Sequence, residues 1–179
     1  MMHLTNTLYY AECAQWQAVS LPFKDHAVVF ELVVPRKGQS LKDAEKALLT
    51  GDILKKRNAE RVQLSMPAFK VSGAHRLRAP LNALGMRDAF INGRANFTGI
   101  DNKQPLFLGN VMHGVWIAVD ERGVEAAAAT ALMSKCGAVK IAEPPKRILA
   151  DRPFAFAMRD QRTGLLLFVG RLNDPTVGA

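Results

Sequence analysis

The sequence has few cysteines and no long apolar run. Its two cysteines, Cys13 and Cys136, lie far apart and lack the pair spacing of a metal or redox motif, so we expect no disulfide framework. The uninterrupted apolar stretches, such as residues 27–30 and 165–169, fall well short of the roughly 18 residues that a membrane-spanning helix needs. We therefore expect neither a disulfide scaffold nor a membrane partner.

Patterns that carry catalysis or bind metals are also missing. The histidines His3, His26, His75 and His113 are too dispersed to indicate a set of metal ligands. No serine stands in a nucleophile-elbow context, and no glycine-rich loop has the form that holds phosphate. We therefore expect no enzyme activity, no metal and no cofactor.

Acidic residues are outnumbered by basic ones. The chain has 24 Lys and Arg against 16 Asp and Glu, which gives a formal net charge of +8. The basic residues form small scattered groups, such as 55–57 and 146–147, without interleaved aromatic residues that could stack on bases. A solvated basic surface is the favoured interpretation, and a site for a polyanion such as heparin is the alternative.

The patterns that are present indicate an α+β fold of about one domain, since 179 residues with 49% hydrophobic residues are ordinary globular composition. β-Branched and aromatic runs predict a meander over residues 8–11, 16–21 and 27–34. Helical spacing after Ser40 predicts a short capped helix, and Pro80 and Gly85 delimit another. Further strands are expected over 61–71, bent or reaching an edge at Pro67, over 111–119, and in a hairpin of 154–158 with 165–172.

Residues 123–133 do not fit this pattern. Their alanine run favours a helix, but small residues occupy every side of that helix and leave little apolar surface for docking. Residues 134–152 follow with no clear periodicity, and such long structureless segments are usually functional or disordered. A surface helix followed by a linker is the structural alternative to a functional loop.

The segment Val119–Thr130 resembles the reactive-loop hinge of the serpins, a family of serine protease inhibitors. Other stretches are similar to serpin motifs in the same order along the chain: Tyr10–Glu12 with Gln17–Phe23, Gln63–Lys70, Leu81–Phe90, Arg152–Phe156 and Leu167–Arg171. The resemblance implies that residues 1–179 are the carboxy-terminal part of one serpin domain. Such a part has mixed and antiparallel sheets, a few short helices and an exposed reactive-centre loop over about residues 121–152.

The resemblance also implies a mechanism. A target serine protease cleaves the exposed loop and is trapped as an acyl-enzyme, while the hinge enters the main sheet as a new strand. The implied hinge residues are Glu121, Gly123, Val124, Glu125, Ala126, Ala127, Ala128, Ala129 and Thr130. Small side chains suit this insertion because they pass between neighbouring strands with little steric cost. No cofactor is implied.

The hinge departs from the family pattern at two positions. Val124 stands where the family usually has threonine, and Arg122 replaces an acidic residue. Val124 is β-branched and close to threonine in shape, so it remains compatible with insertion. The family's loop spacing places the scissile bond at Gly137–Ala138. Three residues are alternatives for the specificity position: Lys135, Cys136 and Lys140.

Other implied roles are structural. His113 matches a histidine buried beneath the main sheet, and Pro153, Phe154 and Gly170 belong to the closing hairpin. The amino-terminal half of the fold lies outside the resemblance, so we expect residues 111–119 to present an unpaired edge and an apolar face. A truncated, non-inhibitory fragment that acts as a binding protein is therefore an alternative function. The resemblance implies an extracellular location, although the chain shows no signal peptide.

Overall fold

The computed structural model describes residues 1–101, 103, 105–120 and 144–176. The chain divides into two compact units. Residues 1–69 and 118–179 form the large unit, and residues 70–117 form the small unit. Each unit has its own elements, and the candidate loop over residues 121–143 lies outside the described residues.

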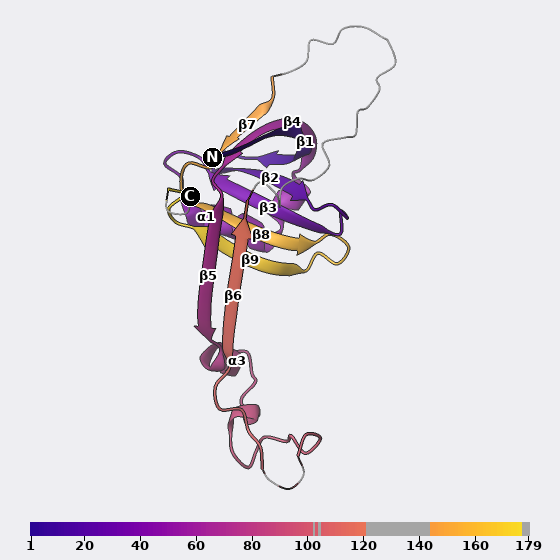
Figure 1. Cartoon of the computed structure of the whole chain (residues 1–179), viewed down its shortest axis with the longest axis vertical. Helices are drawn as coiled ribbons and strands as arrows, with labels where there is room; N and C mark the ends of the chain where they lie inside the picture. Colours follow the sequence, from indigo (N-terminus) through magenta and orange to yellow (C-terminus); the bar gives the residue numbers. More distant parts are fainter. Residues whose placement is uncertain (102, 104, 121–143, 177–179) are drawn as a thin grey trace. The chain divides into compact units, whose positions relative to one another are not determined.

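A seven-stranded sheet dominates the large unit (Figure 1). Its strands, in spatial order, are β7 (Lys146–Leu149), β4 (Asn58–Met66), β1 (Met2–Glu12), β2 (Trp16–Pro22), β3 (Val28–Pro35), β8 (Phe154–Asp160) and β9 (Leu166–Leu172). The pairing of β4 with β7 is parallel, and the other pairings in the sheet are antiparallel. The predicted meander and the predicted closing hairpin are both confirmed.

Three strand predictions need correction. β1 begins at Met2 instead of Leu8, because Met2–Tyr10 pairs with β4 in a register that runs from Met2–Met66 to Tyr10–Asn58. The strand predicted over 61–71 is two strands, since β4 ends at Met66 and β5 (Phe69–Arg76) belongs to another sheet. Pro67 has no N–H to donate to a strand ladder, which explains the break. The structureless segment predicted over 134–152 is wrong at β7, which pairs with β4.

Helix α1 (Leu41–Thr50) begins where the sequence predicts it. The hydroxyl oxygen of Ser40 accepts a hydrogen bond from the backbone N–H of Lys42 at 3.2 Å, and Gly51 ends the helix with a φ of +69°. The buried face of α1 packs against β3 and β8 through Ala44, Ala47 and Leu48. The four-residue helix α2 (Asp52–Lys55) follows directly.

Aromatic rings fill one part of the core of the large unit. The ring of Phe69 lies 5.6 Å from that of Phe154 and 5.2 Å from that of Phe156, measured between centroids. Gly170 pairs with Phe156 across β8 and β9, and a Cβ atom at this position would collide with the Phe156 ring. The absence of a side chain at Gly170 therefore makes room for the aromatic core.

One ion pair is buried in the large unit. The Nε atom of Arg159 on β8 lies 3.1 Å from both carboxylate oxygens of Glu31 on β3, and Glu31 is 0% exposed. The same guanidinium group donates to the carbonyl oxygens of Leu48 at 2.9 Å and of Gly164 at 3.0 Å. Arg159 therefore joins two strands, the end of α1 and the turn of the closing hairpin.

The small unit contains most of a two-stranded sheet formed by β5 and β6 (Met112–Val119). It also contains α3 (Arg78–Ala83) and a short 3₁₀ helix, η1 (Asp88–Phe90). Pro80 lies in the first turn of α3, and Gly85 follows that helix with a φ of +100°, which a residue with a side chain rarely adopts. Both predicted delimiters of this helix are therefore confirmed.

Candidate functional site

The residues of the predicted hinge and scissile bond lie outside the described residues. This applies to Glu121, Gly123, Val124, Glu125, Ala126, Ala127, Ala128, Ala129, Thr130, Lys135, Cys136, Gly137, Ala138 and Lys140. The structure does describe the strands on both sides of this segment. β6 precedes this segment and β7 follows it.

The preceding flank, β6, has an edge to which no other strand pairs within the described part of the chain, because its neighbour in the two-stranded sheet is β5. Two large apolar side chains on this strand are exposed, Met112 at 60% and Trp116 at 65%. The predicted unpaired edge and apolar face are therefore confirmed. No described strand takes up the backbone donors and acceptors along this edge, so an added strand could pair with them.

The burial that the resemblance implies for His113 is not seen within the described residues. His113 lies on β6 and is exposed. A side chain on a sheet is buried only where a second layer packs on its face, and the described residues leave His113 open to solvent. The family resemblance identified the strand correctly, but it assumed a surrounding fold that these residues do not supply.

The following flank, β7, pairs in parallel with residues Val62–Ser65 of β4. Ile148 faces the core and is 1% exposed, and the N–H of Ala150 extends the pairing by donating to the carbonyl oxygen of Ser65 at 2.8 Å. The alternation of buried and exposed residues is too short in a four-residue strand to be recognised from sequence. The side-chain contacts of β7 with distant residues could not be anticipated from any local pattern.

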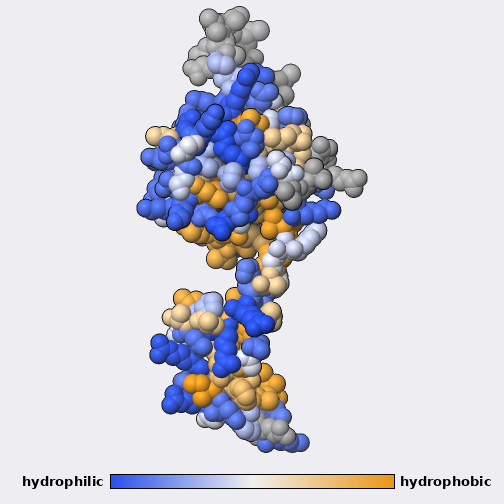
Figure 2. Space-filling view, turned by 90° about the vertical axis from the view of Figure 1, so that its left-hand side faces the viewer, coloured by the Kyte–Doolittle hydropathy of each residue, from blue (hydrophilic) through white to orange (hydrophobic). Residues whose placement is uncertain are grey.

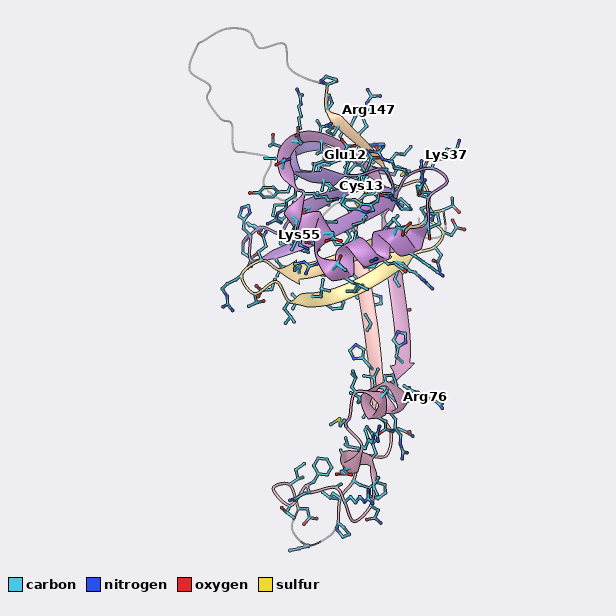
Figure 3. All side chains as sticks on the ribbon, turned by 180° about the vertical axis from the view of Figure 1, so that it is seen from behind. Glu12, Cys13, Lys37, Lys55, Arg76 and Arg147 are labelled. Atoms are coloured by element: carbon cyan, nitrogen blue, oxygen red, sulfur yellow. The ribbon has the colours of Figure 1, made fainter. Side chains whose placement is uncertain are left out.

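A polar cluster joins β7 to the far end of β1. The Nζ atom of Lys146 lies 3.1 Å from Oε1 of Glu12, and Arg36 forms a second ion pair with the same carboxylate. The side-chain amide of Gln17 donates to the carbonyl oxygen of Arg147 at 3.3 Å and to the Tyr10 hydroxyl at 2.8 Å. Figure 3 shows Glu12 and Arg147 in this part of the sheet. We call Tyr10, Glu12, Gln17, Arg36 and Lys146 the anchor cluster.

The electrostatics of the anchor cluster favour the charged form of its carboxylate. The hydrogen bond from Lys146 holds the pKa of Glu12 below its usual value, with further lowering by the hydrogen bonds from Tyr10 and Arg36. Burial raises the pKa of Tyr10, so its hydroxyl stays neutral and donates to Glu12 at 3.0 Å. The cluster is thus an ionised carboxylate held by three donors.

The hairpin residues named by the resemblance have different surroundings. Phe154 is 0% exposed in the aromatic core, and Gly170 makes room for that core, as described above. Pro153 is exposed and lines a shallow cavity of about 490 Å³ together with residues of the β3–α1 connection, including Lys37 and Gly38. Phe154 and Gly170 therefore have a packing role, and Pro153 lies at the surface.

Within residues 1–101, 103, 105–120 and 144–176, no three His, Cys, Asp or Glu side chains gather in a group that could hold a metal ion. No helix in the same residues is long and apolar enough to cross a membrane.

Comparison with known proteins identifies relatives over nearly the whole chain. A serpin-like protein of Thermococcus kodakarensis is 36% identical over 181 residues, which cover 99% of this chain and 42% of that protein. Serpin B10 of Rattus norvegicus is 32% identical, covering 98% of this chain and 45% of its own length. The chain thus spans less than half the length of the curated relatives it matches.

Solved structures share the fold of this chain, and the chain again covers less than half of each of them. The thermophilic serpin tengpin in its native state is 27% identical, with a TM-score of 0.70 over 96% of this chain and 45% of tengpin. Protease nexin-1, solved with heparin, has a TM-score of 0.74 over 97% of this chain at 21% identity, so that likeness shows the fold alone. The α+β fold with mixed sheets and few helices is therefore confirmed as part of a serpin fold.

The family model for "Serpin (serine protease inhibitor)" matches residues 1–175. This match includes both flanks described above and the segment between them. The description of this family names serine protease inhibitors. The chain therefore belongs to the serpin family, of whose domain it matches less than half.

Proposed function

We propose that this chain supplies the carboxy-terminal part of a serpin-type inhibitor of serine proteases. One observation carries the proposal: β6 leads directly into the hinge-like segment and has an edge to which no described strand pairs. An inserted hinge would pair with such an edge and form backbone hydrogen bonds along it. Family membership and the alanine-rich hinge sequence support the same function.

In this function the loop between β6 and β7 is the substrate. The serine hydroxyl of the protease attacks the carbonyl carbon of the scissile residue, the peptide bond breaks, and the new amino terminus leaves as the acyl ester forms. The hinge then enters the sheet beside β6 before water hydrolyses the ester. Residues Ala126–Ala129 favour rapid insertion because they carry little side-chain volume and lose little rotamer freedom.

The test is a covalent complex. The protein is incubated with elastase-, subtilisin- and trypsin-like proteases, and a complex that survives boiling in detergent is the expected product. The mass of the released fragment identifies the bond, with Gly137–Ala138 expected first and the bonds after Lys135, Cys136 or Lys140 as alternatives. Cleavage of the loop by every protease without a complex would overturn the proposal.

A hinge variant separates trapping from simple cleavage. Ala127→Glu places a charged side chain in the inserting strand, so we expect slower insertion, complete hydrolysis of the ester and at least a tenfold loss of complex. Ala127→Ser is the matched control because it keeps the side chain small, and its complex yield should stay within about twofold of the parent. Equal complex yields in both variants would contradict insertion of this segment.

A binding fragment without inhibitory activity is the second candidate function. It is favoured by the exposed apolar side chains of the two units, which include Trp116 on β6 and Leu167 on β9, and by the apolar surface visible in Figure 2. Reversible binding of a partner without any detergent-resistant complex would support this candidate over inhibition.

Heparin binding and an extracellular location are further proposals. The net charge of +8 and the heparin in the protease nexin-1 structure support a polyanion partner, for which residues 55–57 are the densest basic group. A heparin column at rising salt tests this, because an electrostatic contact should weaken steeply with salt. Detection of the protein in the medium of its own cells tests the location.

A further inference from the structure

The strand that follows the candidate loop is weakly held by its backbone. β7 is a four-residue strand at the end of the sheet order, and within the described residues it pairs with β4 and with no other strand. Parallel pairing is slightly less stable per residue than antiparallel pairing, and edge strands open more readily than central ones. Side-chain contacts therefore have a large share in keeping β7 on the sheet.

The contacts of Lys146 pass beyond the neighbouring strand. In the sheet register Lys146 lies opposite Val62, and Val62 lies opposite Asn6 of β1. Roughly 20 Å of extended strand separates Asn6 from Glu12, yet the ammonium and carboxylate groups lie 3.1 Å apart. The sheet must therefore curl so that the long side chain of Lys146 reaches the other end of β1.

The remaining contacts close a ring around the start of β7. Gln17 holds the carbonyl oxygen of Arg147 and the Tyr10 hydroxyl, and that hydroxyl donates to Glu12. Arg36 fixes the carboxylate from the other side and is itself held by the carbonyl oxygen of Cys13 at 2.8 Å. Glu12 is thus oriented by residues of β1 and of the segment after β3 before it meets Lys146.

We propose that Glu12 is a positioning residue for the inhibitory reaction, acting through Lys146 to hold β7, and with it the carboxyl-side end of the reactive loop. A protease binds its substrate on both sides of the scissile bond, so an anchored loop end loses less conformational freedom on binding. Glu12 itself does not touch the protease. The inference rests on the proposed function for its kinetic consequence, whereas the anchoring itself is independent of that function.

Hydrogen exchange of the isolated protein tests the anchoring. In Glu12→Gln the carboxylate charge is lost, and we expect amide exchange in residues 146–150 to become three- to tenfold faster, with β3 and β8 unchanged. Lys146→Met should have the same effect. Lys146→Arg keeps the charge and length of the side chain, so amide exchange in residues 146–150 should stay as slow as in the parent. Unchanged exchange in both Glu12→Gln and Lys146→Met would overturn the proposal.

A matched control comes from the same unit. Glu45 and Arg171 form an ion pair of 3.1 Å with similar exposure but no contact to β7. Glu45→Gln should therefore leave exchange in residues 146–150 unchanged. Faster exchange of β7 in this variant too would show a general loss of stability and would count against a specific anchor.

The kinetic experiment measures complex formation by the same variants with a protease that the parent protein traps. We expect Glu12→Gln to lower the second-order rate of complex formation three- to tenfold while the fraction of loop ending in complex stays the same. An unchanged rate despite faster exchange of β7 would overturn the positioning role. If the parent traps no protease but β7 still loosens in the variant, the anchor stands and the proposed function fails.

Discussion

Two glutamates of the large unit form ion pairs in opposite surroundings. Glu31 is completely buried and meets Arg159 in the core, whereas Glu12 is partly exposed and meets Arg36 and Lys146 at the edge of the sheet. Burial raises the pKa of Glu31 despite the opposing effect of Arg159, and hydrogen bonding by Lys146 lowers the pKa of Glu12. The pKa values of the two glutamates therefore shift in opposite directions, because desolvation is the largest influence only on the buried Glu31.

The comparison also separates structural from positioning roles. The Glu31–Arg159 pair holds strands that pack on α1, so removing one partner leaves an uncompensated charge inside the protein. When one of the charged partners Glu12, Arg36 and Lys146 is removed, water can take its place, because these three side chains are partly exposed. We therefore expect large stability effects in the core pair and small but local effects in the anchor cluster.

The largest expected effect comes from Arg159→Leu. This variant leaves Glu31 buried without its cation and removes the donors to the carbonyl oxygens of Leu48 and Gly164, so we expect a loss of about 3–5 kcal/mol in the free energy of unfolding. Urea denaturation followed by circular dichroism measures it. Arg36→Leu is the control from the anchor cluster, with an expected loss of about 1 kcal/mol or less. Equal losses would remove the distinction between the two pairs.

Glu31→Gln should be less severe. The amide keeps the shape of the carboxylate and can still accept from Arg159. It leaves the guanidinium group without its counter-charge but also removes the buried charge that desolvation disfavours, so we expect a smaller loss than for Arg159→Leu. The same urea titration measures this variant, with Arg159→Leu and the double variant Glu31→Gln/Arg159→Leu alongside. The double variant should lose less than the sum of the single losses, and strict additivity would show that the two groups are not coupled.

The two carboxylates should respond to pH with opposite sign. The folded-state pKa of Glu12 is lowered, so its contribution to stability is present above the ordinary value of 4.5 and is lost as pH falls through the folded value. The folded-state pKa of Glu31 is raised, so the folded state binds its proton more tightly, and stability falls as pH rises from 4.5 through the folded value.

Unfolding free energies measured between pH 3.5 and 8 test the direction in which each carboxylate changes stability with pH. The parent is compared with Glu12→Gln and Glu31→Gln at each pH. The groups facing Glu12 are Tyr10, Arg36 and Lys146, and those facing Glu31 are Arg159 and, at longer range, Arg57. The difference between parent and Glu12→Gln should shrink in acid, and a difference that grows in acid would contradict the lowered pKa.

The smallest effect is expected from Glu12→Gln on global stability. Its carboxylate is more than a third exposed, so we expect a loss of about 0.5 kcal/mol at low salt, reduced further in 0.5 M salt by screening. Thermal unfolding at both salt concentrations measures it, with Glu45→Gln as the matched surface control. A loss above about 2 kcal/mol would place Glu12 with the core pair and not with an edge anchor.

Local patterns predicted much of the fold. The Ser40 cap, the helix end at Gly85 and the β8–β9 hairpin could be predicted from the sequence, because caps, turns and alternating burial depend on neighbouring residues. Strand β7 and the start of β1 were not, because four residues carry no period and the pairing of β1 with β4 joins distant segments. The candidate hinge was recognised by resemblance and remains a prediction.

The sequence alone indicated the serpin family and the closing hairpin, since these depend on motif order and local chemistry, but the loop range it implied, residues 121–152, includes the four residues of β7. Tertiary structure alone decided that His113 is exposed, that Arg159 gathers two strands and a helix end, and that Lys146 meets Glu12 across a curled sheet. The physical reason is distance along the chain. Residues 134 positions apart become neighbours only through the register and curvature of the whole sheet.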